Sequence, residues 1–154
     1  MFEILLNNLI PFVIILTVLV FVHELGHYSI ARYNGVKVEV FSIGFGKELF
    51  GFTDKSGTRW KFSLIPLGGY VKMHGDLDEA SSKKSTKNIN PEDSFHEKTL
   101  NQRSWILFAG PAANFIFSFI ILIFINSYYG YSENIPKISY IDTDKSAYKA
   151  GLRE

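Results

Sequence analysis

The sequence predicts an α+β integral membrane protein, in which two transmembrane helices are joined by a loop rich in β-hairpins. Three observations support this fold class. The 154 residues are 47% hydrophobic, which is high for a short soluble domain because small domains bury only part of their surface. The apolar residues gather in two uncharged runs, 9–22 and 105–125. Between the runs, apolar and polar residues alternate as they do in strands.

The overall charge is nearly balanced, with 16 Lys and Arg residues against 15 Asp and Glu residues. Such a chain lacks the strongly basic character of many nucleic-acid-binding proteins, so we expect no nucleic-acid partner. The sequence has no cysteine, which excludes disulfides, iron–sulfur clusters and a thiol nucleophile. The composition leaves either one dense soluble core or a set of membrane segments.

The first uncharged run is too short to cross a bilayer by itself, because a spanning helix needs about 20 apolar residues. It becomes long enough if the helix continues through residues 23–28. We therefore expect one helix from about Ile4 to about Ile30, within a first segment of residues 1–31. A signal peptide is the alternative, but the only charge before the run is Glu3, where a signal peptide carries basic residues.

The second run contains twenty-one residues, 105–125, and predicts a second transmembrane helix over 105–126. Gly110, Pro111 and Asn114 are unfavourable in a soluble helix but are tolerated in a membrane helix that packs against partners. The alternative is a buried helix of a soluble core. We expect Asn114 to hydrogen-bond across helices, with a direct role in an active site as the other possibility.

The loop between the runs is basic in composition, since residues 31–104 contain 12 of the 16 Lys and Arg residues. Short loops rich in Lys and Arg remain in the cytoplasm. We therefore expect this loop inside, the N-terminus and the residues after about 126 outside, and the lipid bilayer as a partner.

The first part of the loop, residues 32–80, is predicted to be β structure. Apolar residues alternate with polar ones over 36–40 and again over 60–64, which is typical of strands. Residues 54–57 have the composition of a turn. Together these features predict a hairpin over Glu48–Leu64.

The remainder of the loop is less regular. Pro66, followed by Gly68 and Gly69, is expected to interrupt the strand before extended structure resumes over 70–73. Residues 81–91 are polar and poor in apolar side chains, which predicts a linker. This linker occupies the first part of segment 81–104, which ends at the entry to the second helix.

The candidate chemistry lies near the end of the first helix, in the sequence His23-Glu24-Leu25-Gly26-His27. On a helix, His23 and His27 lie roughly 40° apart and about one turn along the axis. Both imidazoles can then bind one metal ion, and zinc suits two imidazoles with an oxygen ligand. Glu24 lies at the flank of that face, where it can take a proton from water and pass it to a leaving amine. This chemistry is peptide hydrolysis.

The alternative interpretation is that the pattern occurs by chance. It would then place three ionisable groups in an apolar helix, where each is costly without compensation. A third metal ligand is not evident, because Ile30 and Tyr33 stand where other zinc proteases have Gly and His. Four further candidates are in strand-like or polar contexts and are expected to be solvated or structural: Glu48, His74, Asp76 and His96. We expect the third ligand to lie outside this chain.

These residues resemble the site-2 protease family of intramembrane zinc metalloproteases, which is M50-like, and most closely its bacterial branch that includes the sigma-E-regulating protease. The likeness extends in order along nearly the whole chain. It covers the His-Glu-Leu-Gly-His pattern and residues 41–46, 63–73, 95–103, 108–115 and 146–152.

The resemblance implies that His23 and His27 bind zinc and that Glu24 is the general base. It implies that residues 32–80 form a membrane-associated β region, in which Gly44, Phe45 and Gly46 offer an edge to an extended substrate. The substrate would be a transmembrane protein, such as an anti-sigma-factor-like or signal-peptide-like protein. The location would be the bacterial inner membrane, with several spans.

The resemblance also implies that residues 127–154 begin a PDZ-like domain. Family members carry the third zinc ligand, an Asp, in a later Leu-Asp-Gly segment that this sequence does not contain. We therefore expect the N-terminal part of a protease, incomplete and inactive alone. The alternatives are a truncated, non-catalytic membrane protein that binds substrate or partner helices, and a soluble zinc protease domain.

Overall fold

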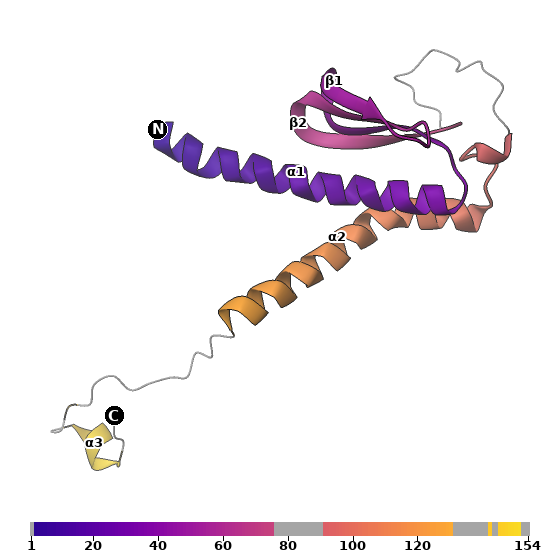
Figure 1. Cartoon of the computed structure of the whole chain (residues 1–154). Helices are drawn as coiled ribbons and strands as arrows, with labels where there is room; N and C mark the ends of the chain where they lie inside the picture. Colours follow the sequence, from indigo (N-terminus) through magenta and orange to yellow (C-terminus); the bar gives the residue numbers. More distant parts are fainter. Residues whose placement is uncertain (1, 76–90, 131–141, 143–144, 152–154) are drawn as a thin grey trace. The chain divides into compact units, whose positions relative to one another are not determined.

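The computed structural model describes residues 2–75, 91–130, 142 and 145–151. The elements in chain order are α1 (Phe2–Tyr33), β1 (Val38–Thr53), β2 (Arg59–Met73), the 3-10 helix η1 (Pro91–Asp93), α2 (Leu100–Tyr129) and α3 (Ser146–Lys149) (Figure 1). The chain forms two compact units, residues 1–120 and 121–154. The α+β class, with two long apolar helices and an antiparallel two-stranded sheet, is confirmed.

Several predicted features fall outside the described residues. They include Asp76 and nearly all of the linker predicted over 81–91. Much of the segment expected to begin a PDZ-like domain, 127–154, is also outside. Within that segment the structure describes the end of α2 and the four-residue helix α3, so the PDZ-like domain stays a prediction.

Helix α1 extends the predicted first helix at both ends and contains Pro11. Its described part is apolar and long enough to cross a membrane, and none of its most apolar 18-residue window is buried within the protein. The helix ends at Tyr33 because Gly35 follows with a φ of 69°, the left-handed conformation that terminates many helices. Val36 is therefore not yet in a strand, although it is buried.

Helix α2 begins at Leu100, five residues before the predicted start, and ends at Tyr129. The earlier start has a local cause. The side chain of Gln102 accepts a hydrogen bond from the backbone N–H of Thr99 at 3.1 Å, and the Thr99 hydroxyl accepts one from the Gln102 N–H at 3.4 Å. This reciprocal pair is a capping box, which begins a helix irrespective of where the apolar run begins.

Strands β1 and β2 form one bent antiparallel hairpin, joined by the predicted turn. Residues 40–43, in the first half of β1, have partners on both sides. Val40 pairs with Arg59 and Lys72, and Ile43 pairs with Phe62 and Gly69. The two ends of β2 therefore flank the first half of β1. The second half of β1 pairs only with the first half of β2 among the described residues.

The predicted interruption of the second strand is wrong. Residues 66–69 remain within β2, which is continuous from Arg59 to Met73. The pairing shifts between Phe45–Ile65 and Ile43–Gly69, so proline and the glycines bend the strand instead of ending it. A bent edge accommodates proline, since its missing N–H need not take part in the ladder.

A small core joins the C-terminal end of α1 to the sheet and to the start of α2. Its six buried residues are Ala31, Val36, Val38, Met73, Phe95 and Ile106. Phe95 precedes α2, and its backbone N–H donates to the carbonyl of His74 at 2.8 Å. The chain just before α2 is thus anchored to the end of the sheet.

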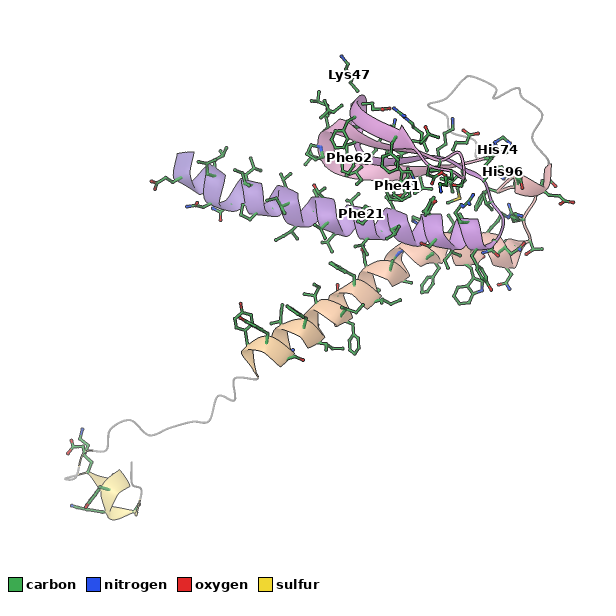
Figure 2. All side chains as sticks on the ribbon, in the orientation of Figure 1. Phe21, Phe41, Lys47, Phe62, His74 and His96 are labelled. Atoms are coloured by element: carbon green, nitrogen blue, oxygen red, sulfur yellow. The ribbon has the colours of Figure 1, made fainter. Side chains whose placement is uncertain are left out.

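Aromatic side chains hold the sheet against α1. Phe41, which is fully buried, stacks on Trp60 with 4.3 Å between ring centroids. It also contacts Phe21 and Tyr28 of α1 edge to face, at 5.9 and 5.7 Å. Figure 2 shows Phe21 and Phe41 at this boundary between helix and sheet. The contacts fix the sheet beside the turn of α1 that carries the two histidines.

Candidate metal centre

The two histidines of the motif lie on one face of α1. The Nε2 atoms of His23 and His27 are 3.2 Å apart, and their ring planes are inclined by 81°. The sequence predicted this convergence from the four-residue spacing, because the helical repeat brings such positions together.

The ring of His27 is oriented by the backbone of α2. His27 Nδ1 donates a hydrogen bond to the carbonyl oxygen of Ile106 at 2.8 Å, and Ile106 is fully buried. A proton on Nδ1 leaves the lone pair on Nε2 available to a metal ion. Metal-binding histidines commonly use this arrangement.

Small residues let α2 approach the histidines closely. At Gly26 of α1, a Cβ atom would collide with the carbonyl oxygen of Ala109 and lie 2.8 Å from the Ala113 side chain. At Gly110 of α2, a Cβ atom would collide with Nε2 of His27 and lie 2.8 Å from Nε2 of His23. Glycine at 110 therefore preserves the space beside both ligating atoms.

Glu24 faces the sheet. The backbone N–H of Val71 in β2 donates to the Glu24 carboxylate. Gly69 lies so close that a Cβ there would be 3.2 Å from Glu24 Cγ and 2.9 Å from Val20. Residues of β2 thus hold the carboxylate that α1 carries, which a sequence pattern in α1 alone does not reveal.

A cavity of about 370 Å³ lies beside the N-terminal end of the motif, and His23, Glu24 and Asn114 supply its polar lining. Apolar residues of α1 and residues from the bends of the sheet supply the remainder: Leu16, Leu19, Val20, Phe45, Leu67, Gly68 and Gly69. The cavity therefore places an apolar surface beside His23, a candidate zinc ligand, and Glu24, the candidate general base.

The three residues predicted to hold substrate have different positions. Phe45 lines the cavity and stacks on Tyr70 at 6.2 Å. Gly44 and Gly46 form the bend beside it, with φ of 89° and 85°, and neither is among the residues that line the cavity. Their glycine character serves the bend, while Phe45 is the residue that the bend directs toward the site.

The histidine pair fits a zinc ion as two of its ligands. Zn–N bonds of 2.0–2.1 Å at a tetrahedral angle would place two ligating nitrogens about 3.3 Å apart, close to the observed 3.2 Å. The described residues contain no group of three His, Asp or Glu side chains suited to a metal.

The other candidate ligands have separate roles in the structure. Glu48 pairs with Arg59, His74 bonds to Glu39 at 2.8 Å, and His96 is exposed. Figure 2 shows Lys47, next to Glu48, and His74 at opposite ends of the sheet. Within the described part of the chain, the histidine pair is thus the candidate metal centre.

Sequence reasoning missed the contributions of Ile106, Gly110, Gly69 and Val71. Ile106 acts through its backbone carbonyl and Val71 through its backbone N–H. Any residue type can provide these atoms, so no residue pattern marks the two positions. The small residues around Gly110 were noticed as signs of helix packing, and the contact of Asn114 with His23 at 3.4 Å confirms the predicted hydrogen bond across helices.

Comparison with known proteins agrees with this site. The family model described as peptidase family M50 matches residues 11–149. Similar proteins named "Putative zinc metalloprotease" include one from Rhizobium meliloti, 45% identical over 97% of this chain and 42% of its own length. Another, from Rickettsia conorii, is 47% identical over 95% of this chain and 40% of its own. A third, from Helicobacter pylori, is 48% identical over 91% and 38%. The chain spans about two fifths of the length of these curated relatives.

Proposed function

The chain belongs to peptidase family M50, and we propose that it supplies the zinc-binding histidines and the general base of an intramembrane metalloprotease. The convergence of His23 and His27 next to Glu24, in a helix apolar enough to cross a membrane, is the observation that carries this proposal.

A membrane setting accounts for the exposure of both long helices. The most apolar window of α1 has no buried residue, and that of α2 is 17% buried. Apolar side chains exposed to water would cost about 25 cal/mol per Å², whereas lipid removes this cost. The basic loop favours the cytoplasmic side for the sheet, and a bacterial inner membrane with several spans is part of the proposal.

The residues divide the chemistry between them. His23 and His27 would hold zinc through their Nε2 atoms, and zinc when bound supplies Lewis acidity that polarises a carbonyl and makes water acidic. The Glu24 carboxylate takes a proton from the attacking water as its oxygen bonds to the peptide carbonyl carbon. Glu24 then gives that proton to the leaving nitrogen as the C–N bond breaks.

A complete centre requires at least one more protein ligand, because catalytic zinc sites usually have three. We propose that it comes from the part of the longer protein beyond residues 1–154, since relatives named as zinc metalloproteases are more than twice as long as the matched region.

The substrate is proposed to be a transmembrane protein that enters as an extended segment. Helical peptide bonds are shielded by their own hydrogen bonds, so a protease must bind its substrate unwound. The bend at Gly44-Phe45-Gly46 borders the cavity through Phe45 and offers backbone groups to such a segment. The apolar lining suits side chains of a membrane-spanning sequence.

The test is a Glu24→Gln substitution in the full-length protein, reconstituted in vesicles with a candidate transmembrane substrate. Loss of a general base is expected to lower the cleavage rate about 10²- to 10⁴-fold with zinc content unchanged. Glu97→Gln, at an exposed position, is the matched control and should cleave normally. Full cleavage by Glu24→Gln would contradict the assigned base.

A non-catalytic binding role is the second candidate. It is favoured by the finding that the described residues hold two of the expected ligands but no group of three. It predicts no cleavage by the full-length protein and zinc well below one equivalent, whereas the protease predicts one equivalent.

A further inference from the structure

We propose that Asn114 is a positioning residue for His23, whose amide oxygen accepts a hydrogen bond from His23 Nδ1 when zinc is bound. This inference rests on the proposed function. It concerns which nitrogen of His23 is available to the metal, and what fixes that choice.

The two histidines receive different support from α2. His27 Nδ1 has a backbone carbonyl as its partner, that of Ile106 at 2.8 Å. A carbonyl can only accept, so the proton of His27 must lie on Nδ1. His23 Nδ1 instead faces the side-chain amide of Asn114, with the Nδ2 atom at 3.4 Å. An amide can donate or accept, so it can serve either form of the His23 ring.

The described orientation of the amide places the ring proton on the wrong nitrogen for metal binding. If Asn114 Nδ2 donates to His23 Nδ1, the ring proton lies on Nε2, where it can donate to His27 Nε2 at 3.2 Å. A protonated Nε2 has no lone pair for zinc. In this orientation the Asn114 Oδ1 atom is buried with no hydrogen-bond partner.

Turning the amide by 180° resolves the conflict with metal binding. The two ends of an amide are nearly equal in size, so the rotation needs little change in packing. It brings an acceptor to His23 Nδ1, which moves the ring proton there and frees Nε2. His23 and His27 would then present matched lone pairs on the side where Gly110 leaves room.

The choice of an amide has a physical reason. Carboxylates often orient metal-binding histidines, but an additional charge within an apolar helix is costly. Asparagine provides an acceptor without a net charge. Pro111 and Gly110 precede it in α2, and the close approach of the helices at Gly26 brings the amide within reach of His23.

The experiment measures zinc affinity of the full-length protein in detergent micelles, by competition with a chromogenic chelator, for three variants. Asn114→Leu keeps the approximate size and removes the acceptor, so affinity should fall about 10- to 100-fold, as for other supporting residues of metal sites. Asn114→Asp keeps an acceptor and cannot donate, so affinity should equal or exceed that of the unsubstituted chain. Asn126→Leu is the control, because the Asn126 amide bonds within its own helix to Leu122, and its affinity should be unchanged.

The outcomes distinguish a failure of the proposed function from a failure of the role assigned to Asn114. If the unsubstituted full-length protein binds no zinc, the proposed function is wrong. If it binds zinc and Asn114→Leu binds equally well, only the role of Asn114 is wrong. An equal loss in Asn114→Asp and Asn114→Leu would also overturn it, because a merely structural amide would be disturbed by either change.

A measurement on the unsubstituted full-length protein guards against a variant that does not fold. With ¹⁵N-labelled histidine and bound zinc, the nitrogen shifts report which ring atom carries the proton. A proton on Nδ1 of His23 is expected. Coordination through Nδ1 with the proton on Nε2 would contradict the proposal outright.

Discussion

The two halves of β1 belong to one strand and both contain large apolar residues, but their surroundings are opposite. In the first half, Val38, Phe41 and Ser42 are fully buried, and residues 40–43 pair with β2 on both sides. In the second half, Leu49, Phe50 and Phe52 are 59–61% exposed. The alternation over 36–40 and the hairpin predicted over Glu48–Leu64 indicate extended structure in each half, but they do not reveal what covers its apolar side chains.

This difference in burial indicates which half of β1 makes the site rigid. The first half lies between α1 and the two ends of β2, and it carries the bend toward the cavity. The second half is an edge with large exposed apolar side chains, an arrangement that soluble proteins avoid because it promotes association. The proposed membrane surface would cover that edge, as the resemblance to a membrane-associated β region implies.

The largest contrast is expected for truncation of one phenylalanine in each half. Phe41→Ala removes a buried ring that contacts Phe21, Tyr28 and Trp60, and should lower the free energy of unfolding by about 3–5 kcal/mol. Phe52→Ala, at an exposed position, should cost less than about 1 kcal/mol. Chemical unfolding in detergent micelles, followed by circular dichroism, measures both. Equal losses would remove the distinction between the halves.

The next effect concerns the contact between the sheet and Glu24. In Gly69→Ala, the new Cβ would lie 2.7 Å from the Ser42 carbonyl oxygen and 2.9 Å from Val20. Such overpacking costs about 1–3 kcal/mol, and the displaced strand should lower cleavage by the full-length protein at least about tenfold. Gly57→Ala strains the turn because Gly57 has a φ of 85°, but its Cβ would have nothing within 4 Å. It therefore controls for a loss of stability away from Glu24 and should leave cleavage unchanged. Normal cleavage by Gly69→Ala would show that the strand does not position Glu24.

Surface labelling tests what covers the second half. The chain has no cysteine, so a single one can be introduced at Phe50, and another at exposed Lys55 in the turn. In vesicles, Phe50→Cys should react with a membrane-impermeant maleimide at least about tenfold more slowly than Lys55→Cys, because lipid excludes the reagent. Similar rates at the two positions would mean that this edge faces water.

The smallest effect is a pH dependence at the turn that joins the strands. The Ser56 hydroxyl donates to the Asp54 carboxylate at 2.6 Å, and with the Trp60 indole at 2.9 Å it holds the pKa of Asp54 well below its usual range. Because the folded pKa is lowered, the stabilisation is complete above about pH 4 and disappears as the pH falls through the folded pKa.

Asp54→Asn tests this dependence. At pH 7 it should reduce the free energy of unfolding by about 1 kcal/mol, and the difference from the unsubstituted chain should shrink as the pH is lowered from about 4. Unfolding at several pH values measures it. A difference that grows toward low pH would have the wrong sign.

The sequence predicted features that depend on neighbouring residues. The apolar runs gave both long helices, although the capping box at Thr99 and Gln102 moved the start of α2 to Leu100. The turn at residues 54–57 joins the strands as predicted. Residues 66–69 predict an interruption where the strand only bends, because proline and glycine are typical of both, and only the pairing with β1 distinguishes them.

The candidate site likewise contains residues that a local pattern predicts and residues whose roles depend on the folded chain. His23, Glu24 and His27 were predicted because their spacing is a local property of one helix. Phe45 lies at the cavity while Gly44 and Gly46 shape the bend, a division of roles that the three-residue pattern did not contain.

The apolar character of the two helices and the placing of two imidazoles on one face follow from residue order, because helical periodicity acts over a few residues. The support of each imidazole instead depends on contacts that exist only in the folded chain. His27 bonds to the carbonyl of Ile106, 79 positions away in the sequence. His23 contacts the amide of Asn114, 91 positions away. Contacts over such separations depend on how closely the helices pack at Gly26 and Gly110, and this packing is a property of the folded chain.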